Sequence, residues 1–459
     1  MNTSELAVSL RQKKTVRWVV AIAAIALVFD GYDLVVYGTI VSGLLADPTQ
    51  LGRLDPAQAG ALGSYALMGV MVGALTTGAI GDHVGRRRVM ITGIVWFSLG
   101  MAATAMAPNI PAFGVLRFLT GIGVGALVAT AGAVVAEFAP AGKRNFYNAI
   151  VYSGVPAGGV LASLVAIALS ESIGWRGLFW IGALPILFLL PMALLKLPES
   201  PQWLASRGRL DEALAVSRLT GVPLAVPAAA VEGTTTMAGA ERVGFAALAT
   251  RRHALPTLLL GFMSFSGLLL TYGLNTWLPQ IMGLYGYGKN YSLTFLLVLN
   301  AGAIIGGVLA SVPADRFGPK KIVSATFLLA ALAMVLLTMQ LPLGILLALM
   351  AVAGVGTIGT QVLIYGFVSN YYQSHARGAG VAWCAGFGRL GGIFGPLVGG
   401  FLLAAGVQNQ VAFLVFAGVA AAGAAVTMFV PRRGEQETDP PVPPAAPESA
   451  APHSPARVG

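Results

Sequence analysis

The stretch GDHVGRRR (Gly81–Arg88) has a counterpart 233 residues further along the chain, ADRFGPKK (Ala314–Lys321). Both follow a long apolar segment, and both carry an acidic residue, a glycine and two basic residues in the same order. The same offset relates Gly158 to Gly391. The sequence therefore predicts two halves that repeat one architecture.

Long apolar segments surround both stretches. Of the 459 residues, 56% are hydrophobic and only 10% are charged, whereas a soluble domain has roughly 25% charged residues. So little charge could not cover a water-facing surface, and lipid is therefore the expected solvent of most of the chain. A segment of about 20 apolar residues crosses about 30 Å of hydrocarbon. We expect twelve such spans, at residues 18–40, 59–80, 89–107, 112–137, 147–169, 178–196, 255–282, 291–313, 322–340, 343–368, 379–404 and 410–430.

These spans predict an all-α integral membrane protein with two pseudo-symmetric six-helix halves. The N-terminal half is expected over residues 1–196 and the C-terminal half over 254–430, with a cytoplasmic central loop at 197–253. The tail, 431–459, is rich in proline and alanine and is expected to be disordered. Repeated halves around a central site are the architecture of alternating-access transporters.

The basic residues indicate topology rather than a nucleic-acid partner, although the net charge is +10. With the N-terminus in the cytoplasm, only Arg53, Arg176 and Lys289 fall in outer segments, and almost all other Lys and Arg fall inside. This asymmetry follows the positive-inside rule, so both termini are expected in the cytoplasm, with lipid headgroups near the basic loops. Cys384 is the only cysteine, which excludes an intramolecular disulfide.

Two aspartates, Asp30 and Asp33, lie in the middle of the first expected span. A charge at mid-bilayer costs at least ~2.5–3.5 kcal/mol, so one is retained where it lines a cavity or pairs. Three residues apart on a helix, the two side chains share roughly one face, and two carboxylates in one low-dielectric cavity cannot both ionise easily. Because no histidine lies within an expected span, a coupled proton would be carried by this pair. Alternatively, the aspartates brace a helix that is broken near Gly31.

Several stretches resemble known transporters. GDHVGRRR is similar to the signature loop of the major facilitator superfamily, and PESPQWL (Pro198–Leu204) is similar to another of its patterns. FDGYDLVVYG (Phe29–Gly38) and TYGLNTWLPQIM (Thr271–Met282) resemble the aromatic acid:proton symporter family within it. AGALGSYALMGVMVGAL (Ala59–Leu75) is more similar to the benzoate carriers of that family than to the hydroxybenzoate carriers. The resemblance covers all twelve spans, and it implies that the aspartates matching the DGxD pattern, Asp30 and Asp33, are required for transport.

Two arginines within spans are the candidate sites for a substrate anion. Arg389 is expected ~15 Å from the cytoplasmic end of its helix, near the midplane, and Arg117 ~8 Å from the outer end of its own. A guanidinium can bind a carboxylate through two parallel hydrogen bonds. The alternative is a salt bridge with Asp30 or Asp33, which stays open for Arg117. For Arg389 we favour binding of the substrate carboxylate over a salt bridge within the protein.

Aromatic rings could supply flat walls for a benzene ring. Trp383 and Phe387, one turn apart and leading towards Arg389, form the best cluster. Each ring alone is also compatible with helix packing or a lipid-interface belt. The candidates are Tyr32, Tyr37, Tyr272, Trp277, Tyr365, Trp383 and Phe387, with Asn275 or Asn300 as polar contacts.

A third group of charged residues lies at the cytoplasmic ends of the spans. Glu137 ends the fourth span and is expected to form a gating ion pair with Lys143, Arg144 or the loop Gly81–Arg88. Asp82 is expected to have a conformational role, because plain positive-inside anchoring explains the arginines beside it but not the acid. The expected gating residues are Asp82, Gly85, Arg86, Arg87, Glu137, Arg144, Asp315 and Arg377.

The resemblance implies proton symport of an aromatic carboxylate by alternating access, with benzoate first and hydroxybenzoate- or protocatechuate-type acids next. A proton-coupled exporter of drugs or metabolites is the alternative, although SGVPAGGV (Ser153–Val160) only partly matches the exporter pattern. A non-transporting sensor would need a larger signalling domain. No metal cluster, nucleophile–base pair or phosphate loop is apparent, so no enzyme activity, metal or cofactor is expected. We expect a monomer in the bacterial inner membrane.

Overall fold

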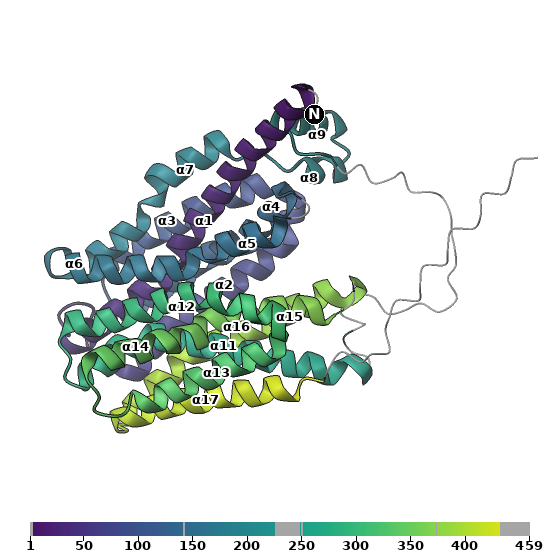
Figure 1. Ribbon diagram of the computed structural model, residues 1–459. Coiled ribbons are helices and arrows are strands. Elements are labelled where there is room, and N and C mark those ends of the chain that lie inside the picture. Colours follow the sequence, from purple (N-terminus) through teal and green to yellow (C-terminus); the bar gives the residue numbers. More distant parts are fainter. Residues whose placement is uncertain (1–2, 141–142, 225–247, 249–250, 373, 432–459) are drawn as a thin grey trace, which may run out of the picture.

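The computed structural model describes residues 3–140, 143–224, 248, 251–372 and 374–431, and all regular structure in these ranges is helical (Figure 1). The first half contains α1 (Thr3–Ala46), α2 (Pro56–Val84), α3 (Arg86–Ala105), α4 (Ile110–Phe138), α5 (Arg144–Tyr152), α6 (Gly154–Ala183) and α7 (Pro185–Lys196). The central loop carries α8 (Pro201–Ser206) and α9 (Leu210–Thr220). The second half contains α11 (Arg251–Leu284), α12 (Lys289–Phe317), α13 (Pro319–Leu336), α14 (Leu343–Gly354), a π-helical turn (Val355–Gly359), α15 (Thr360–Tyr371), α16 (Ser374–Ala404) and α17 (Asn409–Phe429).

Capping side chains mark the start of two of the spanning helices. Asp55 caps α2 by accepting the backbone N–H of Gln58, whose side chain accepts the N–H of Asp55 in return. Asn109 caps α4 through the N–H of Ala112. Both helices carry a proline in their first turn, where its missing N–H is not needed.

The expected fifth and sixth spans are joined in one apolar segment, Phe146–Lys196, so that the eleven candidate segments among the described residues provide twelve crossings. Inside this segment Gly174 has φ 63° and ψ −175°, which lies outside the helical region. A residue with a Cβ rarely adopts that conformation, so the glycine makes the sharp turn possible. The fifth crossing therefore ends, and the sixth begins, at Gly174 rather than at the separate boundaries predicted.

The tenth span is not a regular α-helix. Residues Val355–Gly359 form a π-helical turn between α14 and α15, which the sequence did not predict. The hydroxyl of Thr360 lies 3.0 Å from the carbonyl oxygen of Val355 and 2.8 Å from the hydroxyl of Thr326. Single π-helical turns inside α-helices occur frequently at functional sites.

The repeated glycines make equivalent contacts in the two halves. A Cβ on Gly158 would lie 1.9 Å from the carbonyl oxygen of Val28, so α6 contacts the backbone of α1 directly. A Cβ on Gly391 would lie 2.0 Å from the carbonyl oxygen of Phe265, so α16 contacts α11 in the same way. The structure thus confirms the internal repeat, because glycines related by the sequence offset pack corresponding helix pairs.

The two halves lie side by side, the first in purple to blue and the second in green to yellow (Figure 1). They meet where α2 packs on α16, α6 on α12, and α1 on α11. A Cβ on Gly38 would lie 1.9 Å from the carbonyl oxygen of Asn275, and the hydroxyl of Ser64 donates to the carbonyl of Ile393 over 2.6 Å. Direct backbone contact therefore joins the halves near the end of α1 and the start of α2.

Candidate functional site

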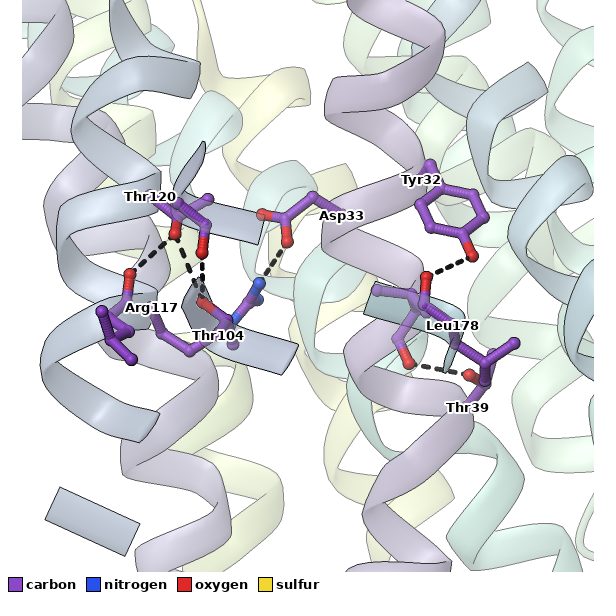
Figure 2. A network of polar contacts seen from close by, with 10 residues as sticks. Tyr32, Asp33, Thr39, Thr104, Arg117, Thr120 and Leu178 are labelled. Carbon is purple, nitrogen blue, oxygen red and sulfur yellow. Dashed lines mark hydrogen bonds and ion pairs between the residues drawn. The ribbon is translucent and has the colours of Figure 1, made fainter. Parts of the chain in front are cut away.

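Asp33 of α1 and Arg117 of α4 form a buried ion pair (Figure 2). Each residue is 1% exposed. The guanidinium also lies over the rings of Tyr37, at 5.3 Å, and Phe179, at 5.8 Å. The pair connects two helices of the first half. Of the two possibilities that the sequence left open for Arg117, the structure contains the salt bridge, and it does not support substrate binding by this side chain.

Tyr32 points away from this ion pair. Its hydroxyl donates to the carbonyl oxygen of Leu178 on α6 over 2.8 Å (Figure 2), and its ring is fully buried beside Phe29. A Cβ on Gly182 would lie 3.4 Å from the Tyr32 ring. Tyr32 therefore belongs to the packed interior of the first half, and the predicted contact with a substrate is not supported.

Asp30 has different surroundings from Asp33. It is 4% exposed, and it makes no hydrogen bond or ion pair with the residues that the structure describes. The charged groups in electrostatic range of its carboxyl are Arg389 of the second half and Asp33. The two aspartates are three residues apart, yet Asp33 is ion-paired within its own half and Asp30 lies in electrostatic range of an arginine of the opposite half.

Arg389 of α16 is the centre of a polar cluster between the halves. It is partly exposed and makes no hydrogen bond or ion pair with the described residues. Asp30, Tyr152, Tyr272 and Tyr365 all lie in its electrostatic range, and they come from α1, α5, α11 and α15. A guanidinium, a carboxyl group and three phenols from both halves thus converge on one region.

Close contacts of α11 with its neighbouring helices lie near this cluster. The ring of Tyr272 lies against Gly392, where a Cβ would be 2.8 Å from the ring. Asn300 donates its amide to the side-chain oxygen of Asn275 over 2.9 Å, and Asn275 donates to the carbonyl of Thr271 over 2.7 Å. A Cβ on Gly159 would lie 2.3 Å from the amide oxygen of Asn300. The buried amide pair therefore lies where α6, α11 and α12 meet.

The aromatic cluster predicted beside Arg389 has another position. Trp383 and Phe387 do stack, with ring centroids 5.4 Å apart, but Trp383 donates to the carbonyl of Thr257 and Phe387 packs on Phe262, both on α11. Two residues along a helix correspond to about 200° of rotation, so Phe387 is on the far side of α16 from Arg389. The pair packs α16 against α11 and lies on another face of α16 than Arg389, and its contact with a substrate stays a prediction.

Sequence reasoning did not include Tyr152 in the site. Under the 233-residue offset, the counterpart of Tyr152 is Ala385, one helical turn before Arg389 on the same face. The internal repeat could therefore have identified Tyr152. This residue lies one helical turn before the position that corresponds to Arg389, so it should face the same central region from the other half. Tyr365, which was among the candidate rings, does lie in the cluster.

At the ends of the spans that were expected to face the cytoplasm, Glu137 pairs with Arg86, with 3.3 Å between Oε1 and Nε. Arg86 belongs to the loop Gly81–Arg88, which was one of the expected partners. Arg144 begins α5 and is exposed. The side chains of three expected gating residues lie outside the described part of the structure: Asp82, Asp315 and Arg377.

The same loop is connected to the stretch after the sixth span. Glu199 accepts the backbone N–H of Arg87 over 3.1 Å, and the Arg87 guanidinium donates to the carbonyl of Leu197 over 2.7 Å. Gly85, with φ 102°, leaves room for the Glu199 carboxylate, which would lie 2.6 Å from a Cβ at this position. The loop Gly81–Arg88 and the stretch Pro198–Leu204 are therefore in direct contact. No group of three metal-ligating side chains occurs among the described residues.

A family model described as Major Facilitator Superfamily matches residues 20–312 and 295–457. The chain is 34% identical over 407 residues to the gentisate transporter of Corynebacterium glutamicum, covering 88% of this chain and 85% of that protein. It is 32% identical over 419 residues to the benzoate transport protein of Acinetobacter baylyi, covering 90% and 88%. A 4-hydroxybenzoate transporter of Acinetobacter baylyi is 30% identical over 427 residues, covering 90% and 91%.

Among solved structures, the fold is similar to the xylose transporter XylE of E. coli in a partially occluded inward open conformation. The TM-score is 0.71 at 19% identity, and the match covers 91% of this chain and 99% of that one. An inward open structure of the same transporter matches with a TM-score of 0.70, also at 19% identity, covering 91% and 96%. At this level of identity the likeness concerns the fold alone.

Proposed function

The chain belongs to the Major Facilitator Superfamily, and on that premise we propose that it imports an aromatic carboxylate together with protons by alternating access. The observation that carries the proposal is the partly exposed Arg389, which has no ion-pair partner among the described residues and lies in electrostatic range of Asp30 on the opposite half. A guanidinium suits a carboxylate, and tyrosine rings suit an aromatic ring. Gentisate, benzoate and 4-hydroxybenzoate are the compounds in the names of the relatives. Each of them contains both a carboxylate and an aromatic ring.

Coupling would arise from competition for Arg389. Without substrate, the guanidinium is the cation in range of the Asp30 carboxylate. A substrate carboxylate bound to Arg389 places a second anion there, and two anions in a closed cavity cannot both be neutralised by one cation. Proton uptake by Asp30 restores the balance, so substrate and proton each favour binding of the other. The neutral cavity can then close and reopen on the other side.

In this proposal the two aspartates have separate roles. Asp30 carries the proton, because it has no hydrogen-bond partner among the described residues and lies in electrostatic range of Arg389. Asp33 instead holds α1 on α4 through Arg117. An ion pair that already neutralises Asp33 leaves it less suited to exchange protons with the cavity.

The cytoplasmic contacts would control the conformational change. The Glu137–Arg86 pair joins the end of α4 to the start of α3, and pairing or separation of charges here would favour one conformation over the other. We propose the same role for Asp82, Asp315 and Arg377. We further propose a monomer in the bacterial inner membrane with both termini in the cytoplasm, the central loop at 197–253 and the tail at 431–459 on that side.

An inward proton gradient is expected to drive accumulation of labelled benzoate or a hydroxylated benzoate in proteoliposomes. Protein-free liposomes measure passive entry of the neutral acid, and a protonophore should remove the carrier-dependent part. A competition panel of benzoate, hydroxybenzoates, protocatechuate, gentisate and a non-aromatic acid tests the substrate class. Efflux driven by the same gradient would indicate an exporter, and failure of every aromatic acid to compete would refute the substrate proposal.

Replacing Arg389 is expected to weaken substrate binding strongly. A hydrogen-bonded charge pair contributes about 1.5–3 kcal/mol, so Arg389→Ala should raise the KM for uptake by about 10- to 150-fold. Arg389→Lys keeps the charge but not the planar fork, so its KM should lie between the two. Arg53→Ala, at an exposed outer arginine, is the matched control. An unchanged KM in Arg389→Ala would show that the carboxylate binds elsewhere.

A further inference from the structure

Gln361 is a buried side chain with one unsatisfied polar atom. It lies on α15 directly after the π-helical turn and is 7% exposed. Its amide nitrogen donates to the hydroxyl of Ser264 over 3.0 Å, but its Oε1 is buried and has no donor among the described residues. Most buried polar atoms in proteins have a hydrogen-bond partner, so such an atom calls for an explanation.

Gln361 lies beside the region around Arg389. Tyr365, which is in the electrostatic range of Arg389, follows Gln361 by one helical turn and therefore shares its face of α15. On the other side, the Ser264 hydroxyl that binds Gln361 would lie 2.3 Å from a Cβ at Gly388, the residue before Arg389. The position of Tyr365 on α15 and the Ser264 contact to Gly388 thus place Gln361 at the edge of the Arg389 cluster, one helical turn before Tyr365.

Two irregular features of the fold keep the Gln361 oxygen in this position. A Cβ on Gly267 would lie 2.4 Å from Oε1, so only a glycine leaves space for it on α11. The π-helical turn inserts an extra residue into the tenth span just before Gln361 and changes the face on which the following residues lie. Thr360, with its hydroxyl beside the Val355 carbonyl, binds the backbone of this turn.

We propose that Oε1 of Gln361 accepts a hydrogen bond from a ring hydroxyl of the bound aromatic acid. An acceptor needs a donor, and an ionised benzoate has none, because its carboxylate oxygens only accept. A hydroxylated benzoate has both groups: the carboxylate for Arg389 and a phenolic O–H for Gln361. Gln361 is thus a specificity-determining residue that favours hydroxylated aromatic carboxylates over benzoate, an inference that rests on the proposed function.

The test compares uptake of labelled benzoate, 3-hydroxybenzoate, 4-hydroxybenzoate and gentisate in proteoliposomes. For the wild-type protein, at least one hydroxylated acid should have a KM about tenfold or more below that of benzoate, since a site with an unsatisfied acceptor disfavours a ligand without the donor. Gln361→Leu should bring the ratio of the KM for benzoate to the KM for that hydroxylated acid close to one. The KM for benzoate itself should stay within about twofold of the wild-type value. Gln340→Leu, the same change at an exposed position, should leave the ratio as in wild type.

Gln361→Met is measured in parallel, so that a folding failure of the leucine variant still leaves one variant in which the ratio can be read. Uptake of all four acids with an unchanged ratio in a folded Gln361 variant would overturn this inference alone. A wild-type ratio close to one for all three hydroxylated acids would overturn it as well. Absence of uptake of every aromatic acid by the wild-type protein would instead refute the proposed function, and this inference with it.

Discussion

Asp30→Asn is expected to abolish proton-driven accumulation while exchange of substrate across the membrane continues. Asparagine cannot release a proton, but its neutral amide resembles the protonated carboxyl that lets the loaded carrier change conformation. A gradient of two pH units allows about 100-fold accumulation for one proton per substrate, and the carrier-dependent part of this should vanish in the variant. Counterflow, measured as exchange of labelled for unlabelled acid without a gradient, should remain.

Two controls make this measurement decisive. Protein-free liposomes account for passive trapping of the weak acid, and Asp47→Asn repeats the substitution at a carboxylate beyond the end of α1, where hydrogen bonds from Gln50 and Thr49 lower its pKa. The Asp47 variant should accumulate substrate as the wild type does. Full accumulation by Asp30→Asn would remove Asp30 from the coupling mechanism and return the proton to Asp33 or another group.

Asp33→Asn is expected to destabilise the protein, because it leaves the buried Arg117 guanidinium without its counter-charge. Breaking a buried ion pair by removing one partner costs about 3–5 kcal/mol, whereas replacing both partners by apolar residues is often neutral. Asp33→Asn should therefore lower the unfolding temperature in detergent, and the double variant Asp33→Leu/Arg117→Met should recover most of the loss. The measurement is thermal unfolding followed by size-exclusion chromatography with fluorescence detection.

The double variant also tests the separation of roles. If Asp33 only holds α1 on α4, proton-driven accumulation should persist once the pair is replaced by packed apolar side chains. Loss of coupling in a variant with wild-type unfolding temperature would mean that Asp33 takes part in proton transfer. An Asp33→Asn protein as stable as wild type would contradict the structural role itself.

The aspartates illustrate how far the sequence could be interpreted. Their position within an apolar span identified both as functional candidates, because an intramembrane charge is costly wherever it occurs. Their different surroundings could not be predicted, because Arg117 and Arg389 lie far away along the chain and either could have paired with either aspartate. Only the packing of α1 against α4, with α16 on the opposite half, brings Arg117 to Asp33 and leaves Arg389 in range of Asp30.

The aromatic residues show a different limit. Trp383 and Phe387 were placed beside Arg389 because they precede it closely in the sequence, but helix rotation puts Phe387 on the opposite face. Tyr152 was missed even though the internal repeat relates it to the helical turn before Arg389. Side chains belong to the same site when they lie on helix faces that point towards it. Residues that are close along the chain can lie on different faces of a helix, so closeness in sequence does not identify the face.

The sequence by itself determined the twelve apolar spans, the repeat of two halves and the identity of the intramembrane charges. These features depend on the composition of single segments and on the energy of placing them in lipid, which is local information. The tertiary structure decided which charges pair, which rings reach Arg389, and where Gln361 lies after the π-helical turn. These depend on distances between helices remote in sequence and on the register of an irregular backbone, and both are set only when the helices pack.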